Sequence, residues 1–217
     1  MTSLDLAWAV RSVDSLLRQR QGIAEISDDK DCVIRIAIAP ARRTIELSDG
    51  TTIAAGDPMI RMHYWNEHLP MMPPDGPNAA WAAVLLTRLR HSFGILADRL
   101  ESDPDLAEVR GIEAAPAFAY GFRGAIQLSR ICERFGFDVF ALENDRRLAG
   151  RVHDVLDGFL VWGLIWAFNP GALRGHGLSH RRIQVLMSRR RLLSLYGDGP
   201  VRDMAGREAL LNQAERI

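Results

Sequence analysis

The first half of the chain contains two stretches in which apolar and polar or small side chains alternate with the period of a β-strand. Residues 32–40 read CVIRIAIAP, with isoleucines recurring on one face, which favours a strand because β-branched side chains fit a pleated sheet. Residues 44–47 and 51–54 flank Asp49 and Gly50, a pair that tolerates the positive φ angles of a tight turn. The pattern therefore predicts a strand followed by a β-hairpin.

A further strand is predicted over residues 59–65, and it carries polar side chains on one face. Successive side chains of a strand point to opposite faces, so Arg61 and His63 share a face with Met59. The opposite face is apolar or aromatic and consists of Ile60, Met62 and Tyr64. We therefore expect an arginine and a histidine to project together from this strand.

Apolar residues at helical spacing predict long helices on either side of these strands. The clearest helix follows a proline-rich loop and begins at Asn78, a residue type that caps helix N-termini. Its apolar stripe consists of Trp81, Val84, Leu85, Leu89, Phe93, Leu96 and Leu100. A first helix is predicted after a cap at Thr2 or Ser3, and the most apolar helix is predicted over residues 148–168.

The second half of the chain adds further strands. A strand over residues 109–114, a helix over residues 122–135 and a strand over residues 137–142 predict a β-α-β unit with a right-handed crossover. Gly136 is expected to end the helix of this unit. A short strand over residues 183–187 and a final helix capped by a serine follow it.

Composition is that of a globular domain. The 217 residues are 47% hydrophobic and 25% charged, which is ordinary for a globular domain and excludes collagen-like and disordered chains. We therefore expect a single α+β domain over residues 1–197, with a hairpin-rich mixed sheet, one β-α-β unit and packed amphipathic helices. Residues 198–217 are expected to form a polar tail or a loose helix.

The charges are balanced overall. The chain has 27 basic and 27 acidic residues, so we expect no nucleic-acid partner. Lys30 is the only lysine, and the many arginines carry planar guanidinium groups that suit carboxylates or phosphates.

The sequence shows no apolar run long enough to span a bilayer and no signal-peptide core, so the expected location is the cytoplasm. Cys32 and Cys132 lack metal-ligand spacing and are expected to be buried free thiols.

Four segments are informative when they are taken together. Residues 46–67 read ELSDGTTIAAGDPMIRMHYWNE, and residues 134–142 read RFGFDVFAL. Residues 167–174 read AFNPGALR, and residues 186–197 read LMSRRRLLSLYG. In this order the segments resemble the signature of the YkoP-like domain family, and the likeness runs from about residue 14 to residue 197.

The resemblance implies a biological context. YkoP-like domains occur alone or joined to polysaccharide deacetylases, in the company of glycosyltransferases and other envelope-building enzymes. It therefore implies an accessory role in the synthesis of cell-envelope polysaccharide or lipid, with such enzymes as partners. The His and Asp motifs that bind metal in the deacetylases are absent from this chain, so the resemblance implies no reaction.

The first candidate site lies around the strand predicted over residues 59–65. His63 would supply an acid–base group that titrates near neutral pH, and Arg61 and Asn66 would contact a ligand. Asp57, at the entrance of the strand, would orient His63. The alternative is structural: Asp57 caps its turn, and His63 is a hydrogen-bonded residue of a partly buried sheet. His63 and His68 are five residues apart, which does not suit a shared metal ion, so no metal site is predicted.

The second candidate site is the start of the last predicted helix. Backbone amides at a helix N-terminus and neighbouring guanidinium groups attract anions, so Ser188 and Arg189 could clamp a phosphate or a sugar carboxylate. The alternative is a capping serine followed by solvated arginines. If both candidate sites bind one ligand, a single pocket should join His63 to this helix.

A third feature is the apolar stretch over residues 159–168, which contains Trp162 and Trp166. Tryptophan favours the interface of a membrane, so this stretch could contact the inner membrane peripherally. A helix that is apolar on all sides is also what a domain core contains. It could equally form a surface for a partner or a second copy.

Together these features favour an accessory or ligand-binding protein with a polar His/Arg pocket for an anionic or sugar-containing ligand. The alternative is an enzyme that acts on a lipid-linked or activated sugar, with His63 as general base and Arg189 neutralising the charge of the ligand. No cofactor is predicted, because the glycine pattern over residues 121–124 lacks the third glycine of a dinucleotide-binding loop. Ser129 and Cys132 have no neighbouring base in the sequence, so neither is predicted to be a nucleophile.

Overall fold

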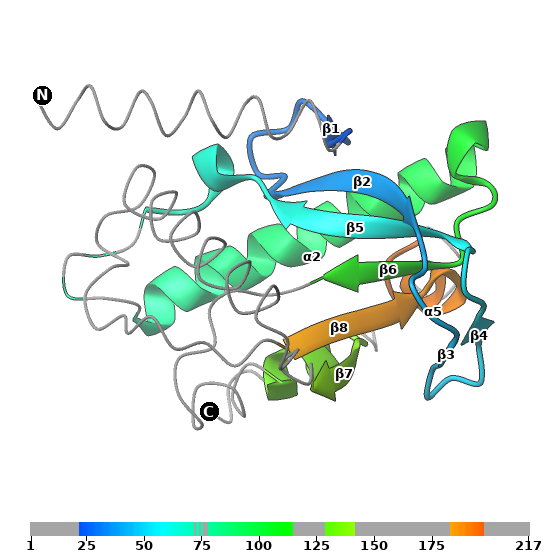
Figure 1. Cartoon of the computed structure of the whole chain (residues 1–217). Helices are drawn as coiled ribbons and strands as arrows, with labels where there is room; N and C mark the ends of the chain where they lie inside the picture. Colours follow the sequence, from blue (N-terminus) through cyan, green and yellow to red (C-terminus); the bar gives the residue numbers. More distant parts are fainter. Residues whose placement is uncertain are drawn as a thin grey trace, which may run out of the picture.

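A six-stranded mixed sheet organises the protein (Figure 1). The structure is a computed structural model, and it describes residues 22–71, 73, 75, 78–114, 129–141 and 183–197. The strand order is β1-β2-β5-β6-β8-β7, and a separate two-stranded sheet pairs β3 with β4. The strands are β1 (Ala24–Glu25), β2 (Ile34–Pro40), β3 (Ile45–Glu46), β4 (Thr52–Ile53), β5 (Pro58–Tyr64), β6 (Gly111–Ala114), β7 (Asp138–Ala141) and β8 (Ile183–Ser188). The predicted α+β fold is confirmed.

One β-α-β unit with adjacent parallel strands is formed by β5, α2 and β6. Helix α2 (Ala79–Ser102) connects these strands, which pair in parallel with Arg61 opposite Glu113. The sequence placed such a unit later in the chain, from β6 to β7. Those two strands are parallel to each other because each is antiparallel to β8, but β8 lies between them. β6 and β7 are therefore not neighbours in the sheet. The strand between them, β8, begins more than forty residues after β7 ends.

The predicted hairpin is confirmed and is very short. Ile45 pairs with Ile53, and the turn contains Gly50 at a φ of +79°, a conformation that glycine adopts without a steric penalty. The Asp49 carboxylate accepts a hydrogen bond from the backbone N–H of Thr51 at 3.0 Å, which closes the turn locally.

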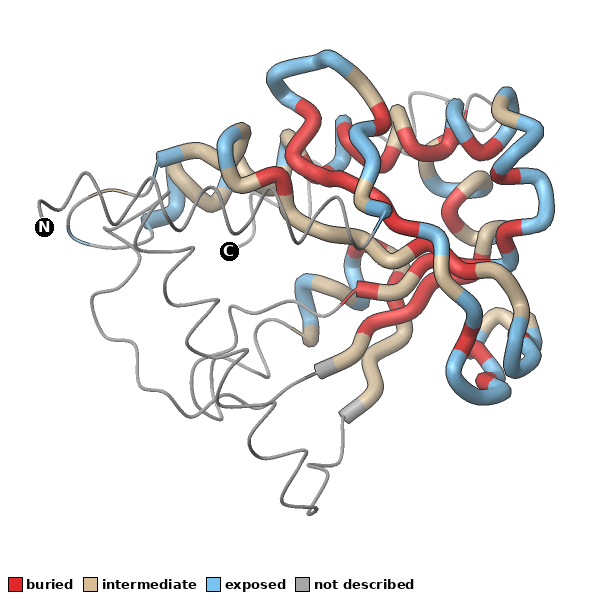
Figure 2. Tube along the Cα trace, turned by 45° about the horizontal axis from the view of Figure 1, so that its top comes forward, coloured by how far each residue is buried: buried red, intermediate tan, exposed pale blue. Residues whose placement is uncertain are grey.

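Helix α2 covers one face of the sheet, and the main core lies between them. Asn78 caps the helix as predicted, because its side chain accepts a hydrogen bond from the backbone N–H of Trp81. The predicted apolar stripe is buried from Leu89 onwards, whereas Val84 is exposed. The largest buried core members in this layer are Ile34, Ile60, Leu96, Leu100, Ile112, Met187 and Leu192. Figure 2 shows the buried residues along the central strands and the exposed residues in the loops.

Two shorter helical segments complete the same side of the molecule. Residues 129–134 are helical, and Gly136 follows them at a φ of +88°, as its predicted role at the helix end requires. Helix α5 (Arg189–Tyr196) begins at Ser188, whose hydroxyl accepts from the backbone N–H of Arg191. Both predicted ends are confirmed, and α5 packs against α2 through Phe93 and Tyr196, whose ring centroids are 5.2 Å apart.

Several predictions fall outside the described residues. They concern the first helix after Thr2 or Ser3, the helix over residues 148–168 with Trp162 and Trp166, and the tail over residues 198–217. Of the helices that are described, none combines the length and the apolar character that crossing a membrane requires. Cys32 is buried and Cys132 is partly buried, and both are free thiols, as the sequence predicts.

Candidate functional site

The face of the sheet that α2 does not cover carries a group of polar side chains. Strand alternation places Arg61 and His63 on this face of β5, as predicted, with Glu113 opposite Arg61 on β6. Gln184 of β8 adds a hydrogen bond to Glu113 on the same face. We call Arg61, His63, Glu113 and Gln184 the polar band.

The β3–β4 hairpin covers the part of this face next to the polar band. A second, smaller core joins the two layers and consists of Ala41, Ile45, Leu47, Ile53, Met59 and Leu186. The hairpin approaches the sheet closely at Gly111, where an added Cβ would lie 2.6 Å from the Ile53 Cδ1 atom. Residues two apart on a strand lie on the same face. Arg61 follows Met59 on β5, and Glu113 follows Gly111 on β6, so the polar band begins where the hairpin stops covering the sheet.

An ion pair and a hydrogen bond hold the centre of the polar band. The Arg61 Nε atom lies 3.6 Å from the Glu113 Oε2 atom, and the Gln184 amide donates to the Glu113 Oε1 atom at 2.8 Å. The side chains of Arg61 and Glu113 keep 31% and 19% of their surface exposed. Glu113 is therefore oriented by two partners and still reaches solvent.

His63 is half-buried beside this pair. Among the described residues its ring has no hydrogen-bond partner, so none of them supports the structural alternative of a hydrogen-bonded sheet histidine. Burial lowers the pKa of His63 below its ordinary value of 6.5, and the positive charge of Arg61 lowers it further. The imidazole is therefore neutral at pH 7 and offers one donor and one acceptor.

The remaining residues of the first candidate site separate along β5. Asn66 begins the short 3-10 helix η1 (Asn66–His68), three residues beyond His63. Asp57 precedes β5, six residues before His63, which corresponds to about 20 Å along an extended strand. Its carboxylate accepts from the backbone N–H of Ala54 at 2.8 Å. The expectation that Asp57 orients His63 is wrong, and its alternative role as a turn cap is confirmed.

The second candidate site has partners inside the fold. Ser188 is buried, and its hydroxyl donates to the Asp49 carboxylate at 2.5 Å. The Arg189 guanidinium donates to backbone carbonyls in the last turn of α2 and at the end of η2 (Pro104–Leu106). The acceptors are the carbonyl oxygens of Leu100, Leu106 and Ala107, at 2.5, 2.6 and 2.8 Å. These groups therefore stabilise the junction between the helices and the hairpin.

The two candidate sites do not form one pocket. Ser188 lies opposite Gly111, which in turn lies opposite Met59 near the start of β5, whereas His63 is near the end of β5. The antiparallel direction of β8 brings its C-terminal end to the hairpin. The predicted shared pocket is wrong for this reason.

A further cluster of charged and aromatic side chains lies next to the band. Arg35 is opposite His63 on β2, is buried, and forms ion pairs with Glu25 at 3.0 Å and Glu67 at 3.4 Å. Its guanidinium lies 4.4 Å from the centre of the Trp65 ring. These two glutamates therefore compensate the charge of Arg35.

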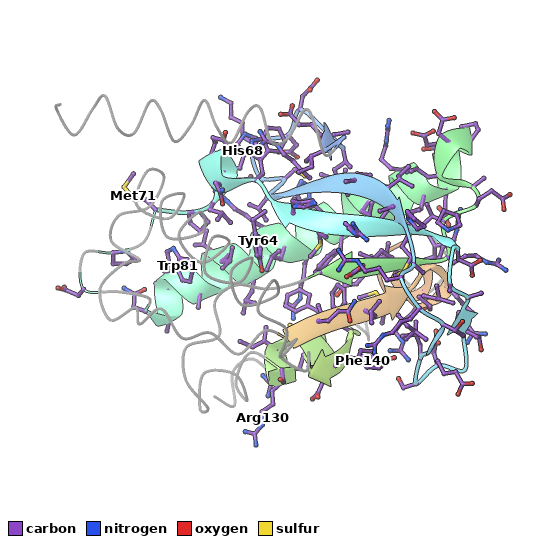
Figure 3. All side chains as sticks on the ribbon, in the orientation of Figure 1. Tyr64, His68, Met71, Trp81, Arg130 and Phe140 are labelled. Atoms are coloured by element: carbon purple, nitrogen blue, oxygen red, sulfur yellow. The ribbon has the colours of Figure 1, made fainter. Side chains whose placement is uncertain are left out.

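Trp65 also stacks on the His68 ring, with ring centroids 3.7 Å apart. The His68 Nδ1 atom lies 2.8 Å from the backbone oxygen of Cys32, so this histidine supports the loop before β2. In the described part of the chain, no group of three His, Cys, Asp or Glu side chains could hold a metal ion. Figure 3 shows His68 near the end of β5 and Phe140 at the far edge of the sheet.

Sequence reasoning found Arg61 and His63 but missed Glu113 and Gln184. Both are polar residues inside otherwise apolar strands, at positions 113 in GIEA and 184 in IQVLMS. That interruption is the signal that could have identified them. Their proximity to Arg61 could not be inferred, because it depends on β6 pairing with both β5 and β8.

Comparisons with known proteins agree with the resemblance found in the sequence. No curated protein and no solved structure matches the chain. The model of the YkoP domain matches residues 6–196, which is most of the chain. The protein therefore belongs to the YkoP domain family.

Proposed function

We propose that this protein binds a sugar-containing or anionic small ligand at the polar band and acts as an accessory component of cell-envelope polysaccharide or lipid synthesis. The observation that carries the proposal is His63, whose half-buried ring has no hydrogen-bond partner among the described residues and lies beside the charged Arg61. Among the described residues, the ring nitrogens of His63 are not among the buried polar atoms that lack a partner, so they stay accessible and can hydrogen-bond to a ligand.

The chemistry of the band suits small polar ligands. Arg61 engages Glu113 through its Nε atom, which leaves the terminal nitrogens to donate to a ligand. Glu113 and His63 supply acceptors, and Asn66 follows β5 at the start of η1. Binding sites commonly combine a few such convergent polar groups with an apolar surround, which the hairpin core provides here.

The envelope context comes from the family. Because YkoP-like domains occur beside polysaccharide deacetylases and glycosyltransferases, enzymes of these classes are the proposed protein partners. The proposed location is the cytoplasm, with peripheral contact to the inner membrane through Trp162 and Trp166. Cell fractionation with and without Trp162→Asp would test that contact, and identical soluble fractions for both proteins would contradict it.

A second candidate function is an enzyme that acts on a lipid-linked or activated sugar. The lowered pKa of His63 supports it, because a general base must be unprotonated at the working pH. In this reading His63 would act without Asp57, which lies at the other end of β5.

Amide and imidazole NMR shifts would test the proposed binding. The probes are methyl α-D-glucopyranoside, glucuronate and glucose 1-phosphate, each added at up to about 20 mM. We expect shifts to concentrate at Arg61, His63, Glu113 and Gln184. If none of the probes changes these signals, the proposed site is wrong.

The variant His63→Gln separates the two functions, because glutamine can hydrogen-bond but cannot act as a base at neutral pH. An accessory protein should retain binding within about fivefold. An enzyme should lose its turnover of an activated sugar such as UDP-glucose. The matched control is His91→Gln, which changes an exposed histidine on α2.

A further inference from the structure

In the described part of the polar face, each arginine is paired with at least one carboxylate. Arg61 lies 3.6 Å from Glu113. Arg35, the next cation on this face, pairs with Glu25 and Glu67. His63 adds no charge at pH 7, since burial and Arg61 lower its pKa. The band therefore contains one formal positive charge and one formal negative charge.

This balance does not suit a ligand that binds mainly through an anionic group. A phosphate or carboxylate accepts hydrogen bonds and needs several donors of positive charge. Here the partly exposed Glu113 carboxylate lies within 4 Å of Arg61. An anion placed on Arg61 would lie close to this carboxylate, and the repulsion would oppose its binding.

Hydroxyl groups match the band better, because each hydroxyl donates one hydrogen bond and accepts up to two. Glu113 can accept from a ligand hydroxyl with the lone pairs that Gln184 and Arg61 leave open. The terminal nitrogens of Arg61 can donate to the neighbouring hydroxyl oxygen. His63 supplies one further donor and one further acceptor. Two adjacent hydroxyls on one ring could therefore bridge Arg61 and Glu113.

An aromatic residue continues this row across the sheet. Phe140 of β7 lies opposite Gln184 and is half-buried against the hairpin core. Figure 3 shows it at the edge of the sheet that β7 and β8 form. A pyranose ring has an apolar C–H face as well as hydroxyls at its edge. The row from Arg61 through Glu113 and Gln184 to Phe140 offers partners for both.

We infer that the polar band recognises adjacent hydroxyl groups of a neutral sugar unit, with Glu113 and Arg61 binding the two hydroxyls, and does not select for a phosphate or carboxylate. The inference rests on the proposed function, because it assigns the ligand class of the same site. It predicts that the charge of the sugar contributes little to affinity.

An NMR titration distinguishes these classes. The probes are the methyl glycosides of glucose, mannose and galactose, together with glucose 1-phosphate and inorganic phosphate, in low-salt buffer. We expect at least one neutral glycoside to shift the Arg61, His63, Glu113 and Gln184 signals, with a Kd within about threefold of that of the phosphorylated sugar. We expect phosphate alone to leave these signals unchanged.

The outcomes separate this inference from the proposed function. Binding of phosphate or glucose 1-phosphate at least tenfold tighter than that of every glycoside would overturn the inference and leave ligand binding at the band intact. If none of the five probes shifts the four signals, both the proposed function and the inference fail.

The variant Glu113→Gln provides the sharpest test, because it removes the negative charge and keeps a side chain of the same shape. Glycoside binding should weaken about tenfold, and phosphate binding at Arg61 should become detectable. The matched control, Glu108→Gln, makes the same charge change at an exposed loop position before β6 and should alter neither. Unchanged glycoside binding in Glu113→Gln would overturn the inference.

A second variant keeps the test valid if Glu113→Gln unfolds. Arg61→Gln removes the other half of the ion pair, so it should weaken glycoside binding about tenfold without creating a phosphate site. Thermal unfolding of each variant confirms that the folded protein is being titrated. Unchanged glycoside binding in Arg61→Gln would equally contradict the assignment of Arg61 to a ligand hydroxyl.

Discussion

Asp49 and Ser188 are 139 residues apart in the sequence, and the Ser188 hydroxyl donates a 2.5 Å hydrogen bond to the Asp49 carboxylate. The same hydroxyl accepts from the backbone N–H of Arg191 and so caps α5. One oxygen atom therefore connects the turn of the β3–β4 hairpin to the start of the last described helix.

Neighbouring residues extend this connection. Asp138 accepts from the Ser48 hydroxyl at 2.5 Å and from Arg191 at 3.0 Å, and Arg191 also donates to Ser48 at 2.9 Å. Three of the segments that carry the family resemblance, at residues 46–67, 134–142 and 186–197, thus meet in one hydrogen-bonded network. This part of the family signature marks a junction that holds the fold, and the polar band lies elsewhere on the sheet.

Replacing Asp49 with asparagine should destabilise the protein in a pH-dependent way. Burial raises the pKa of Asp49, but hydrogen bonds from Ser188 and Thr51 and the charge of Arg191 outweigh it and lower the pKa from 3.8 to about 2. This difference corresponds to about 2 kcal/mol at pH 7. The contribution is present above pH 4 and is lost as the pH falls from about 4 towards 2.

Urea unfolding of the wild type and Asp49→Asn at several pH values measures the effect. The free energy of unfolding should differ by about 2 kcal/mol at pH 7, and the two proteins should converge near pH 2. Asp28→Asn, an exposed position, is the control. A difference that stays constant from pH 7 to pH 2 would contradict the assigned cause.

Two glycines should respond in opposite directions to alanine. At Gly111 a Cβ would lie 2.6 Å from the Ile53 Cδ1 atom and 2.9 Å from the Met187 backbone oxygen, so Gly111→Ala should cost about 1–3 kcal/mol by overpacking. Gly94 lies within α2, where the nearest atom would be 4.0 Å away, so Gly94→Ala should stabilise by about 0.5–1 kcal/mol. Thermal unfolding checks both, and a neutral or stabilising Gly111→Ala would show that the hairpin does not pack on the sheet this way.

The sequence predicted local structure well where one segment determines its own conformation. The Asp49-Gly50 turn, the Asn78 and Ser188 caps and the helix end at Gly136 depend on nearby residues only, and all are confirmed. The pairing of distant segments was not predictable in this way. The insertion of β8 between β6 and β7 decides which polar residues meet, and no local pattern encodes it.

The same limit explains the errors at the candidate site. Alternation along β5 placed Arg61 and His63 on one face correctly, but residue spacing alone also suggested that Asp57 could reach His63.

The sequence also offered no indication of Ser92 in the core, although its buried hydroxyl accepts from the Val33 backbone N–H at 2.9 Å and donates to the Arg88 carbonyl. A buried serine in a helix has no distinguishing sequence pattern, because its partner is 59 residues away.

Arg189 should affect stability and not anion binding. Its guanidinium donates to three carbonyl oxygens between Leu100 and Ala107, and an ammonium group has no planar fork with which to reach them all. Arg189→Lys should therefore lower the free energy of unfolding by about 1–3 kcal/mol. Arg134→Lys, at an exposed position, should change it by less than about 0.5 kcal/mol.

Inorganic phosphate supplies the second half of this test. If Arg189 clamped an anion, about 10 mM phosphate would raise the Tm of the wild type and not that of Arg189→Lys. We expect phosphate to leave the Tm difference between the two proteins unchanged. A Tm difference that depends on phosphate would instead support the predicted anion site at Arg189.

The pKa of His63 should be lower than 6.5 and should depend on Arg61. Burial is the larger cause of the lowered pKa, and the charge of Arg61 is the smaller one. Arg61→Gln should therefore raise the pKa of His63, measured by NMR titration of its ring protons, without returning it to 6.5. Arg43→Gln, which removes an exposed arginine before β3, is the control and should leave the pKa unchanged.

The lowered pKa also has a consequence for folding. Below pH 6.5 the unfolded chain takes up a proton at His63 before the folded protein does, so the stability falls as the pH decreases from 6.5 towards the pKa of the folded state. His63→Gln removes this titration and should flatten that part of the pH profile. A His63 pKa at or above 6.5, or an identical pH profile for His63→Gln and the wild type, would show that the folded protein does not disfavour the charged imidazole. The polar band would then lack the half-buried neutral imidazole on which ligand recognition there depends.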